Sequence, residues 1–182
     1  TPIARLLLRL GISPDVVTVV GTLGVCFGAL FFFPRGQLLA GVLFITAFVF
    51  SDTLDGIMAR MQGRQGVWGA YLDSTLDRFG DAAVFGGLAI WFFTGGEDLL
   101  MAYLALACLV LGSLVSYARA RAEGLGMRAD VGIAERADRL VSTLVTTGLV
   151  GLGLPQVVLT AVLSCLNSGL YTASRMLFVL AG

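Results

Sequence analysis

Six apolar segments, each long enough to approach the thickness of a lipid bilayer, constrain this 182-residue chain more than any other feature. The hydrocarbon core of a bilayer is about 30 Å thick, and a helix needs about 20 apolar residues to cross it. Only 13% of the residues are charged, roughly half of the share in soluble domains. We therefore predict an all-α, polytopic membrane protein. Its six predicted transmembrane helices run from about Val16 to Phe33, Leu38 to Met61, Trp68 to Thr94, Leu99 to Ala120, Ile133 to Leu152 and Pro155 to Leu180.

The distribution of arginines predicts how these spans are oriented. All 12 basic residues are arginines. With six spans, one side of the membrane carries Arg5, Arg9, Arg60, Arg64, Arg119, Arg121, Arg128, Arg136 and Arg139, and the other side carries Arg35. Because cytoplasmic loops are rich in Lys and Arg, the arginine-rich side is predicted to face the cytoplasm.

The first 12 residues place Ile3, Leu6, Leu7 and Leu10 on one helical face and Arg5 and Arg9 on another. This pattern is typical of an amphipathic helix that lies in the membrane interface. A simple cytosolic segment leading into the first span would show a similar pattern. We predict a single domain over residues 1–182, with the interfacial helix at 1–12 and a six-helix bundle at 13–182.

Four aspartates lie on the second and third predicted spans. Asp52 and Asp55 are three residues apart, and Asp73 and Asp77 are four apart, so each pair occupies one helical face. An antiparallel hairpin with its turn near residues 62–66 would bring all four together, roughly 10–20 Å along the helices from the turn.

Four carboxylates cannot all stay ionised in a shared apolar site unless cations compensate them. Two divalent ions would balance the four charges, as in metal-assisted phosphoryl transfer. Since the chain has no histidine, a Ser-His-Asp triad and a histidine-ligated zinc site are excluded. Carboxylates bind hard cations, which indicates Mg²⁺, Mn²⁺ or Ca²⁺. A purely structural role, or a cation pathway of a transporter or channel, remains an alternative for such aspartates.

The same segment carries eight residues at fixed gaps. Their order is Asp52-x2-Asp55-Gly56-x2-Ala59-Arg60-x8-Gly69-x3-Asp73-x3-Asp77. This order resembles, position for position, the signature of the CDP-alcohol phosphotransferase family, which is also called the CDP-alcohol phosphatidyltransferase family. The rest of the chain is similar to the six-helix membrane fold of that family.

The resemblance implies an enzyme in which an acceptor hydroxyl attacks the β-phosphorus of a CDP-linked lipid and CMP leaves. It implies that Asp52, Asp55 and Asp73 hold one metal ion, and that Asp73 and Asp77 hold a second. Two Mg²⁺ ions are expected, with Mn²⁺ possible in their place. Asp77 would also be the general base. The family is commonly homodimeric, so we expect a homodimer.

The resemblance also implies a set of residues that bind the CDP-linked lipid. Gly56 would let the nucleotide approach the helix backbone, Arg60 would pair with phosphate and Gly69 would leave room across the hairpin, although Gly69 is equally explained by helix packing. Pro14, Asp15 and Thr18 resemble a Pro-Asn-x-x-Thr element of the family that contacts the cytidine nucleotide, with Asp15 where Asn is usual. Pro14 and Asp15 are also ordinary residues for the start of a helix.

Arginines near the cytosolic ends of the later spans predict a phosphorylated acceptor, because a guanidinium binds phosphate in a bidentate manner. The candidates are Arg121, Arg136, Arg139 and Arg175. Arg139 and Arg175 lie within predicted spans, where charged groups usually face a cavity, whereas Arg128 and Arg119 suit topology anchors. Glu135 or Asp138 could instead pair with Arg136 or Arg139.

The segments around these arginines resemble actinobacterial enzymes of the family that make phosphatidylinositol phosphate. We therefore expect transfer of a phosphatidyl group from CDP-diacylglycerol to inositol phosphate. Glycerol phosphate is the alternative acceptor within the same family. A divalent-cation transporter or channel is the alternative from a different functional class.

Overall fold

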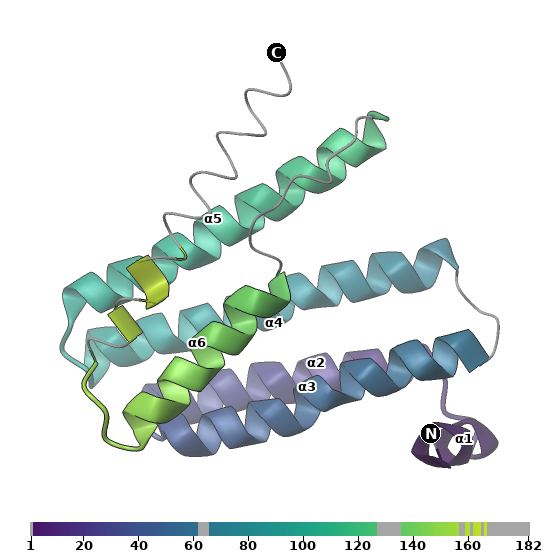
Figure 1. The fold of residues 1–182 in the computed structure, drawn as a ribbon, viewed down its shortest axis with the longest axis horizontal. Helices are drawn as coiled ribbons and strands as arrows, with labels where there is room; N and C mark the ends of the chain where they lie inside the picture. Colours follow the sequence, from purple (N-terminus) through teal and green to yellow (C-terminus); the bar gives the residue numbers. More distant parts are fainter. Residues whose placement is uncertain are drawn as a thin grey trace.

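The computed structural model describes residues 2–61, 66–126, 136–156, 159–160, 162–164 and 166. Every regular element in these ranges is helical, which confirms the all-α prediction. The elements are α1 (Pro2–Arg9), α2 (Pro14–Phe32), the 3-10 turn η1 (Phe33–Arg35), α3 (Leu38–Met61), α4 (Val67–Thr94), α5 (Leu99–Gly124) and α6 (Arg136–Gly151). In Figure 1, α2 to α6 run alternately in opposite directions, and α1 lies at the end of the bundle where α3 ends and α4 begins.

The helix bounds agree closely with the predicted spans. α3 covers the same residues as the second span, and α4 begins one residue before the third. Within the described ranges, two helices are long and apolar enough to cross a membrane, Pro14–Arg35 and Leu99–Gly124. Charged residues in the second half of α3 and the first half of α4 lower the apolar character of those two helices. In the predicted sixth span, residues 159–160, 162–164 and 166 are helical, whereas Pro155 and Gln156 are not, and residues 167–182 lie outside the described part.

Local capping explains where the helices begin and end. The Ser13 side chain accepts a hydrogen bond from the Val16 N–H at 3.3 Å, and Pro14 occupies the first helical position of α2, where no backbone donor is needed. Pro34 ends the same helix through η1, and Gly36 follows with a positive φ of 71°. The Asp98 side chain caps α5 by accepting from the Met101 N–H at 3.1 Å.

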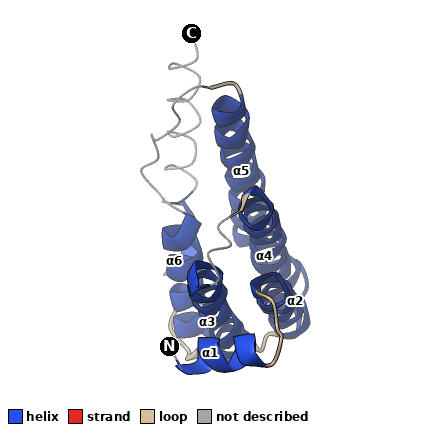
Figure 2. Ribbon diagram, turned by 90° about the vertical axis from the view of Figure 1, so that its right-hand side faces the viewer, coloured by secondary structure: helices blue, strands red, loops and turns tan. Residues whose placement is uncertain are grey.

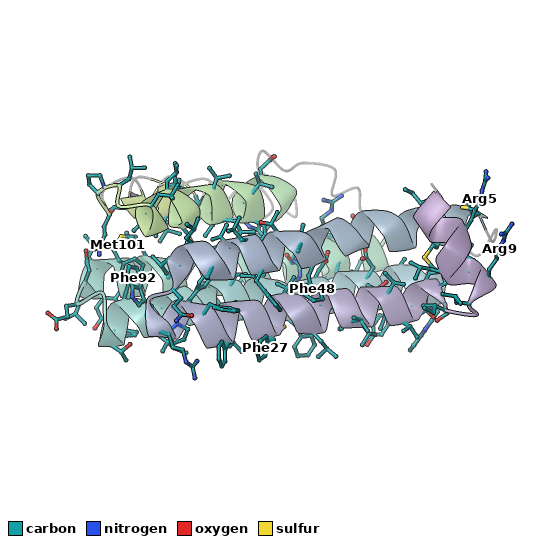
Figure 3. All side chains as sticks on the ribbon, turned by 90° about the horizontal axis from the view of Figure 1, so that it is seen from below. Arg5, Arg9, Phe27, Phe48, Phe92 and Met101 are labelled. Carbon is teal, nitrogen blue, oxygen red and sulfur yellow. The ribbon has the colours of Figure 1, made fainter. Side chains whose placement is uncertain are left out.

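The helix α2 is the common packing partner of α3 and α4. Gly24 and Gly28 of α2 lie directly against the rings of Phe48 and Phe44 of α3, and Phe48 is labelled in Figure 3. A Cβ atom at Gly87 of α4 would lie only 2.6 Å from the Ala29 carbonyl oxygen of α2. Small residues allow such close helix packing without large side chains between the backbones.

The remaining helices pack on either side of these three, with α6 against α3 and α5 against α4. The end-on view in Figure 2 shows α5, α4 and α2 following one another on one side and α3 and α6 on the other. The buried apolar cluster gathers toward the η1 end of the bundle, with Phe33, Ile45, Phe85, Phe92 and Met101 all nearly inaccessible. Large apolar side chains such as Phe27 point outward instead, as expected for a surface that contacts lipid (Figure 3).

We predict that Gly87→Ala lowers the melting temperature of the protein in detergent by several degrees. The added methyl group meets the Ala29 carbonyl oxygen at 2.6 Å, which is backbone and cannot rotate away. Overpacking of this kind typically costs about 1–3 kcal/mol. Gly86→Ala is the matched control, because nothing described lies within 4 Å of its Cβ, and alanine favours a helix over glycine. Equal melting temperatures for the two variants would contradict the close α2–α4 packing.

Candidate active site

The backbone register of α3 and α4 places the four aspartates at two matching depths. Asp55 lies six residues before the end of α3, and Asp73 lies six residues after the start of α4, about 9 Å along each helix at 1.5 Å per residue. Asp52 and Asp77 lie roughly one turn deeper. The side chains of Asp52, Asp55 and Arg60 are outside the described part of the structure, so only their positions on α3 are known.

The two aspartates of α4 differ in their surroundings. Asp73 is exposed, whereas Asp77 is half-buried and its Oδ2 atom lies 4.0 Å from Nη2 of Arg78. The positive charge of Arg78 beside Asp77 partly offsets the concentration of negative charge on this helix. The described side chains include no group of three or more acids or cysteines that could hold a metal ion, and the side chains of Asp52 and Asp55 are not among them.

Arg78 also links α4 to α5. Its Nη1 atom donates a hydrogen bond to Oγ of Ser116, and Oγ of Ser116 in turn donates to the Gly112 carbonyl at 2.8 Å. Sequence reasoning missed this arginine, although its position next to Asp77 in the middle of a predicted span was a usable signal.

A buried ion pair joins α6 to α4. Nη2 of Arg139 lies 3.4 Å from Oδ2 of Asp81, and the two residues are 4% and 8% exposed. The sequence offered Glu135 and Asp138 as partners, but Asp138 is exposed and Glu135 lies outside the described residues. The partner of Arg139 that the structure shows is Asp81, which was not among the alternatives drawn from the sequence. Asp81 was missed because its partner is 58 positions away in the sequence.

Of the other candidate arginines, the structure describes Arg121 and the backbone of Arg136. Arg121 is exposed in the last turn of α5, and Arg119 beside it forms an exposed pair with Glu123 at 3.0 Å. Arg136 begins α6, with its side chain outside the described part. Arg128 and Arg175 both lie outside the described residues.

The candidate residues for nucleotide binding lie on α2, α3 and α4. Asp15 is half-buried in the first turn of α2, and Thr18 is buried one turn later, with Oγ1 donating to the Pro14 carbonyl at 3.1 Å. Gly56 is half-buried on α3. A Cβ built at Gly69 of α4 would meet no described atom within 4 Å, so helix packing in the described part does not require glycine there.

The donor chemistry of α3 and α4 suits a hard divalent cation. Asp52, Asp55, Asp73 and Asp77 offer only carboxylate oxygens, which Mg²⁺, Mn²⁺ and Ca²⁺ prefer. The carboxylates also sit within about 15 Å of the helix ends, which is close enough to the aqueous side for polar ligands to reach them.

Comparison with known proteins identifies relatives over most of the chain. Residues 11–170 match the model of the CDP-alcohol phosphatidyltransferase family. The chain is 52% identical over 153 residues to a phosphatidylinositol phosphate synthase of Streptomyces avermitilis, a match that covers 84% of this chain and 63% of that protein. It is 53% identical over 151 residues to the synthase of Cutibacterium acnes, covering 83% of this chain and 73% of that protein.

Two solved structures are also similar. Both are crystal structures of the Mycobacterium tuberculosis phosphatidylinositol phosphate synthase at 40% identity. The one with CDP-DAG bound has a TM-score of 0.92 and the match covers 98% of this chain and 91% of that chain. The one in complex with manganese and citrate has a TM-score of 0.93, covering 99% and 87%. The matched segment nevertheless spans less than two thirds of the Streptomyces protein.

We predict that Ser116→Ala lowers the melting temperature by a few degrees. The variant removes the oxygen that accepts from the Arg78 guanidinium, and hydrogen bonds to charged groups contribute about 1.5–3 kcal/mol. Ser113→Ala is the control, because Ser113 is exposed on the same helix and, among the described residues, its Oγ bonds only to the Leu109 carbonyl. Thermal unfolding in detergent compares the two. A similar small change in both variants would mean that the Arg78–Ser116 contact contributes nothing to stability.

Proposed function

Because the chain belongs to the CDP-alcohol phosphatidyltransferase family, we propose that it transfers the phosphatidyl group of CDP-diacylglycerol to a hydroxyl of inositol phosphate and releases CMP. The observation that supports this choice of substrates most strongly is the identity of about half of the aligned residues with two phosphatidylinositol phosphate synthases. The related structure with CDP-DAG bound supports the same donor.

The proposed setting is a bacterial inner membrane. Six transmembrane helices over residues 13–182 would form one domain, with residues 1–12 lying at the interface. The helix α1 and its two exposed arginines, which lie at the end where α3 meets α4 (Figure 3), support an interfacial position beside the site. The positive-inside rule supports an active site that faces the cytoplasm. A homodimer is proposed from the family alone.

The proposed metal cofactor is a pair of divalent ions, Mg²⁺ or Mn²⁺. Asp52, Asp55 and Asp73 would hold one ion, and Asp73 and Asp77 the second. The all-carboxylate donor set and the manganese complex of the M. tuberculosis enzyme support this assignment. When bound, such ions polarise the diphosphate and neutralise the charge on the departing CMP.

In the proposed reaction, Asp77 acts as the general base. It accepts the proton of the acceptor hydroxyl, whose oxygen forms a bond to the β-phosphorus of the lipid diphosphate. The bond from that phosphorus to the bridging oxygen breaks, and CMP leaves with the electron pair. The half-buried position of Asp77, one turn from the exposed Asp73, fits a group that meets a hydroxyl at the inner end of the site.

The remaining candidates divide into a nucleotide side and an acceptor side. On the nucleotide side, Asp15, Thr18, Gly56, Arg60 and Gly69 would bind CDP-diacylglycerol. No described atom lies within 4 Å of a Cβ built at Gly69, which supports a role in ligand clearance over a role in packing against the described helices. On the acceptor side, a phosphate would be bound by Arg121, Arg136, Arg139 and Arg175.

The experiment that tests the function is an acceptor panel with the purified protein. CDP-diacylglycerol and Mg²⁺ are supplied with inositol phosphate, free inositol or glycerol phosphate, and both CMP release and the lipid product are measured. We expect turnover with inositol phosphate. A preference for glycerol phosphate would instead identify a phosphatidylglycerol phosphate synthase. Cation flux into liposomes without CMP release would contradict the enzyme assignment altogether.

We predict that Asp77→Asn reduces turnover by about 10²-fold or more while the melting temperature stays near that of the wild type. General-base catalysis typically contributes 10²–10⁴-fold, and an amide cannot take the proton. Asp138→Asn is the control, because Asp138 is an exposed aspartate on α6 outside the proposed site. Near-normal turnover of the Asp77 variant would remove this residue as the base.

We also predict that Arg175→Ala raises the KM for inositol phosphate by roughly 10- to 150-fold, the equivalent of the 1.5–3 kcal/mol that a charge-assisted contact contributes. The KM for CDP-diacylglycerol should change little. Arg128→Ala is the control, since the sequence predicts Arg128 to lie between two spans, where solvent and lipid headgroups would screen its charge. Equally small effects at both positions would mean that these arginines only set topology. The identity of the acceptor would then have no support from the arginines.

A further inference from the structure

The Asp81–Arg139 pair is unusual because both charges are almost completely removed from water. Asp81 is on α4 and Arg139 is in the first turn of α6, and their exposures are 8% and 4%. Gly112 of α5 lies alongside, since a Cβ there would be 3.5 Å from Nη2 of Arg139. Three helices therefore meet around one guanidinium. Breaking a buried ion pair by removing one partner leaves an uncompensated charge and is strongly unfavourable.

The Arg139 side chain lies toward Asp81 and away from water. An arginine in the first turn of a helix can extend toward the nearby aqueous end and place its charge in water. Here the guanidinium is instead turned inward, to a carboxylate on another helix, at 3.4 Å. The acid on α4 is the group in the described part of the protein that compensates this inward position.

The guanidinium keeps hydrogen-bonding capacity that Asp81 does not use. It has five N–H donors, and Nε is buried with no hydrogen-bond partner among the described residues. One turn further along α6, Oγ1 of the fully buried Thr143 likewise has no partner there. Buried polar groups normally have partners, so these two point to a polar ligand. A guanidinium held at one edge can bind a phosphate at another.

The position of Asp81 on α4 connects this anchor to the proposed base. Asp77 and Asp81 are four residues apart, so they share a helical face and lie about 6 Å apart along the axis. A rigid helix therefore carries both the group that would take the acceptor's proton and the group that holds Arg139. When the base and the group that holds the phosphate-binding arginine keep a fixed distance, a bound acceptor has its hydroxyl placed for reaction.

We propose that Asp81 is a positioning residue that holds the Arg139 guanidinium inside the bundle, so that its remaining donors bind the phosphate of the acceptor in register with Asp77. This inference rests on the proposed function, because it takes a phosphorylated acceptor as the ligand. In this role Asp81 acts through Arg139.

The test is the kinetics of Asp81→Asn, with Asp138→Asn as the control on α6. We expect the KM for inositol phosphate to rise roughly tenfold or more, as for the loss of a charge-assisted contact. The KM for CDP-diacylglycerol should stay within about twofold of the wild type. In the proposal Arg139 binds the acceptor, so the variant removes no charge-assisted contact to the lipid donor. A pair that is merely structural would lower the melting temperature and leave the ratio of the two KM values unchanged, and that result would overturn the proposal.

Two further variants keep the test decisive if Asp81→Asn folds poorly. The charge exchange Asp81→Arg with Arg139→Asp restores an ion pair, but it puts the guanidinium on α4, so a folded protein should still show the raised acceptor KM. Wild-type acceptor KM in that variant would overturn the proposal. Asp81→Glu keeps the carboxylate and should raise the acceptor KM less than Asp81→Asn does. An acceptor KM for Asp81→Glu that is equal to or higher than that of Asp81→Asn would also contradict the proposal.

The wild-type acceptor panel separates this inference from the proposed function. If the wild-type protein uses no phosphorylated acceptor, the proposed function fails, and the Asp81 variants have no acceptor KM to change. If the wild type uses inositol phosphate and Asp81→Asn leaves its KM unchanged, the function stands and only the positioning role is wrong.

Discussion

The free energy needed to keep charged side chains inside an apolar helical bundle is the constraint on which this structure depends. Removing an ionised group from water costs several kcal/mol unless the protein supplies a partner of opposite charge or hydrogen bonds. The described bundle supplies them across helices, through the Arg139–Asp81 pair and the Arg78–Ser116 hydrogen bond. Both contacts involve α4, which is also one of the two helices that carry the candidate metal ligands. The polar residues therefore set how α4 is held by α5 and α6.

Packing and chemistry occupy different halves of the same helices. The apolar core gathers at the η1 end, where Phe33, Phe85 and Phe92 are buried and where Gly87 lets α4 approach α2. The aspartates lie in the opposite halves of α3 and α4. Because the core holds the helices together from one end, the polar half does not have to contribute apolar contacts of its own. Charged residues can accumulate there at a smaller cost to the fold.

Much of the fold could be predicted from the sequence, because the length of an apolar segment and the glycines and prolines at its ends are local signals. They placed α3 at the observed bounds and α4 within one residue. The depth match between Asp55 and Asp73 followed in the same way, from counting residues along two consecutive helices that are close in sequence. The partner of Arg139 could not be found like this. Asp138 was the nearest carboxylate in sequence, but the true partner is on another helix, and no periodicity within α6 points to α4.

The spacing of the acidic residues on α4 shows how Asp81, which the sequence analysis missed, relates to the candidate metal ligands. Asp73, Asp77 and Asp81 follow one another at four-residue steps, so they form one gently rotating stripe from an exposed position, through a half-buried one, to a buried one. Each step inward requires a closer cationic partner, because less water is available to stabilise the charge. At the innermost step that partner is an arginine of α6 rather than an ion from solution. Thus a single helix face would define both the metal end and the acceptor end of the reaction, and a small movement of α4 would displace the two together without changing the distance between them.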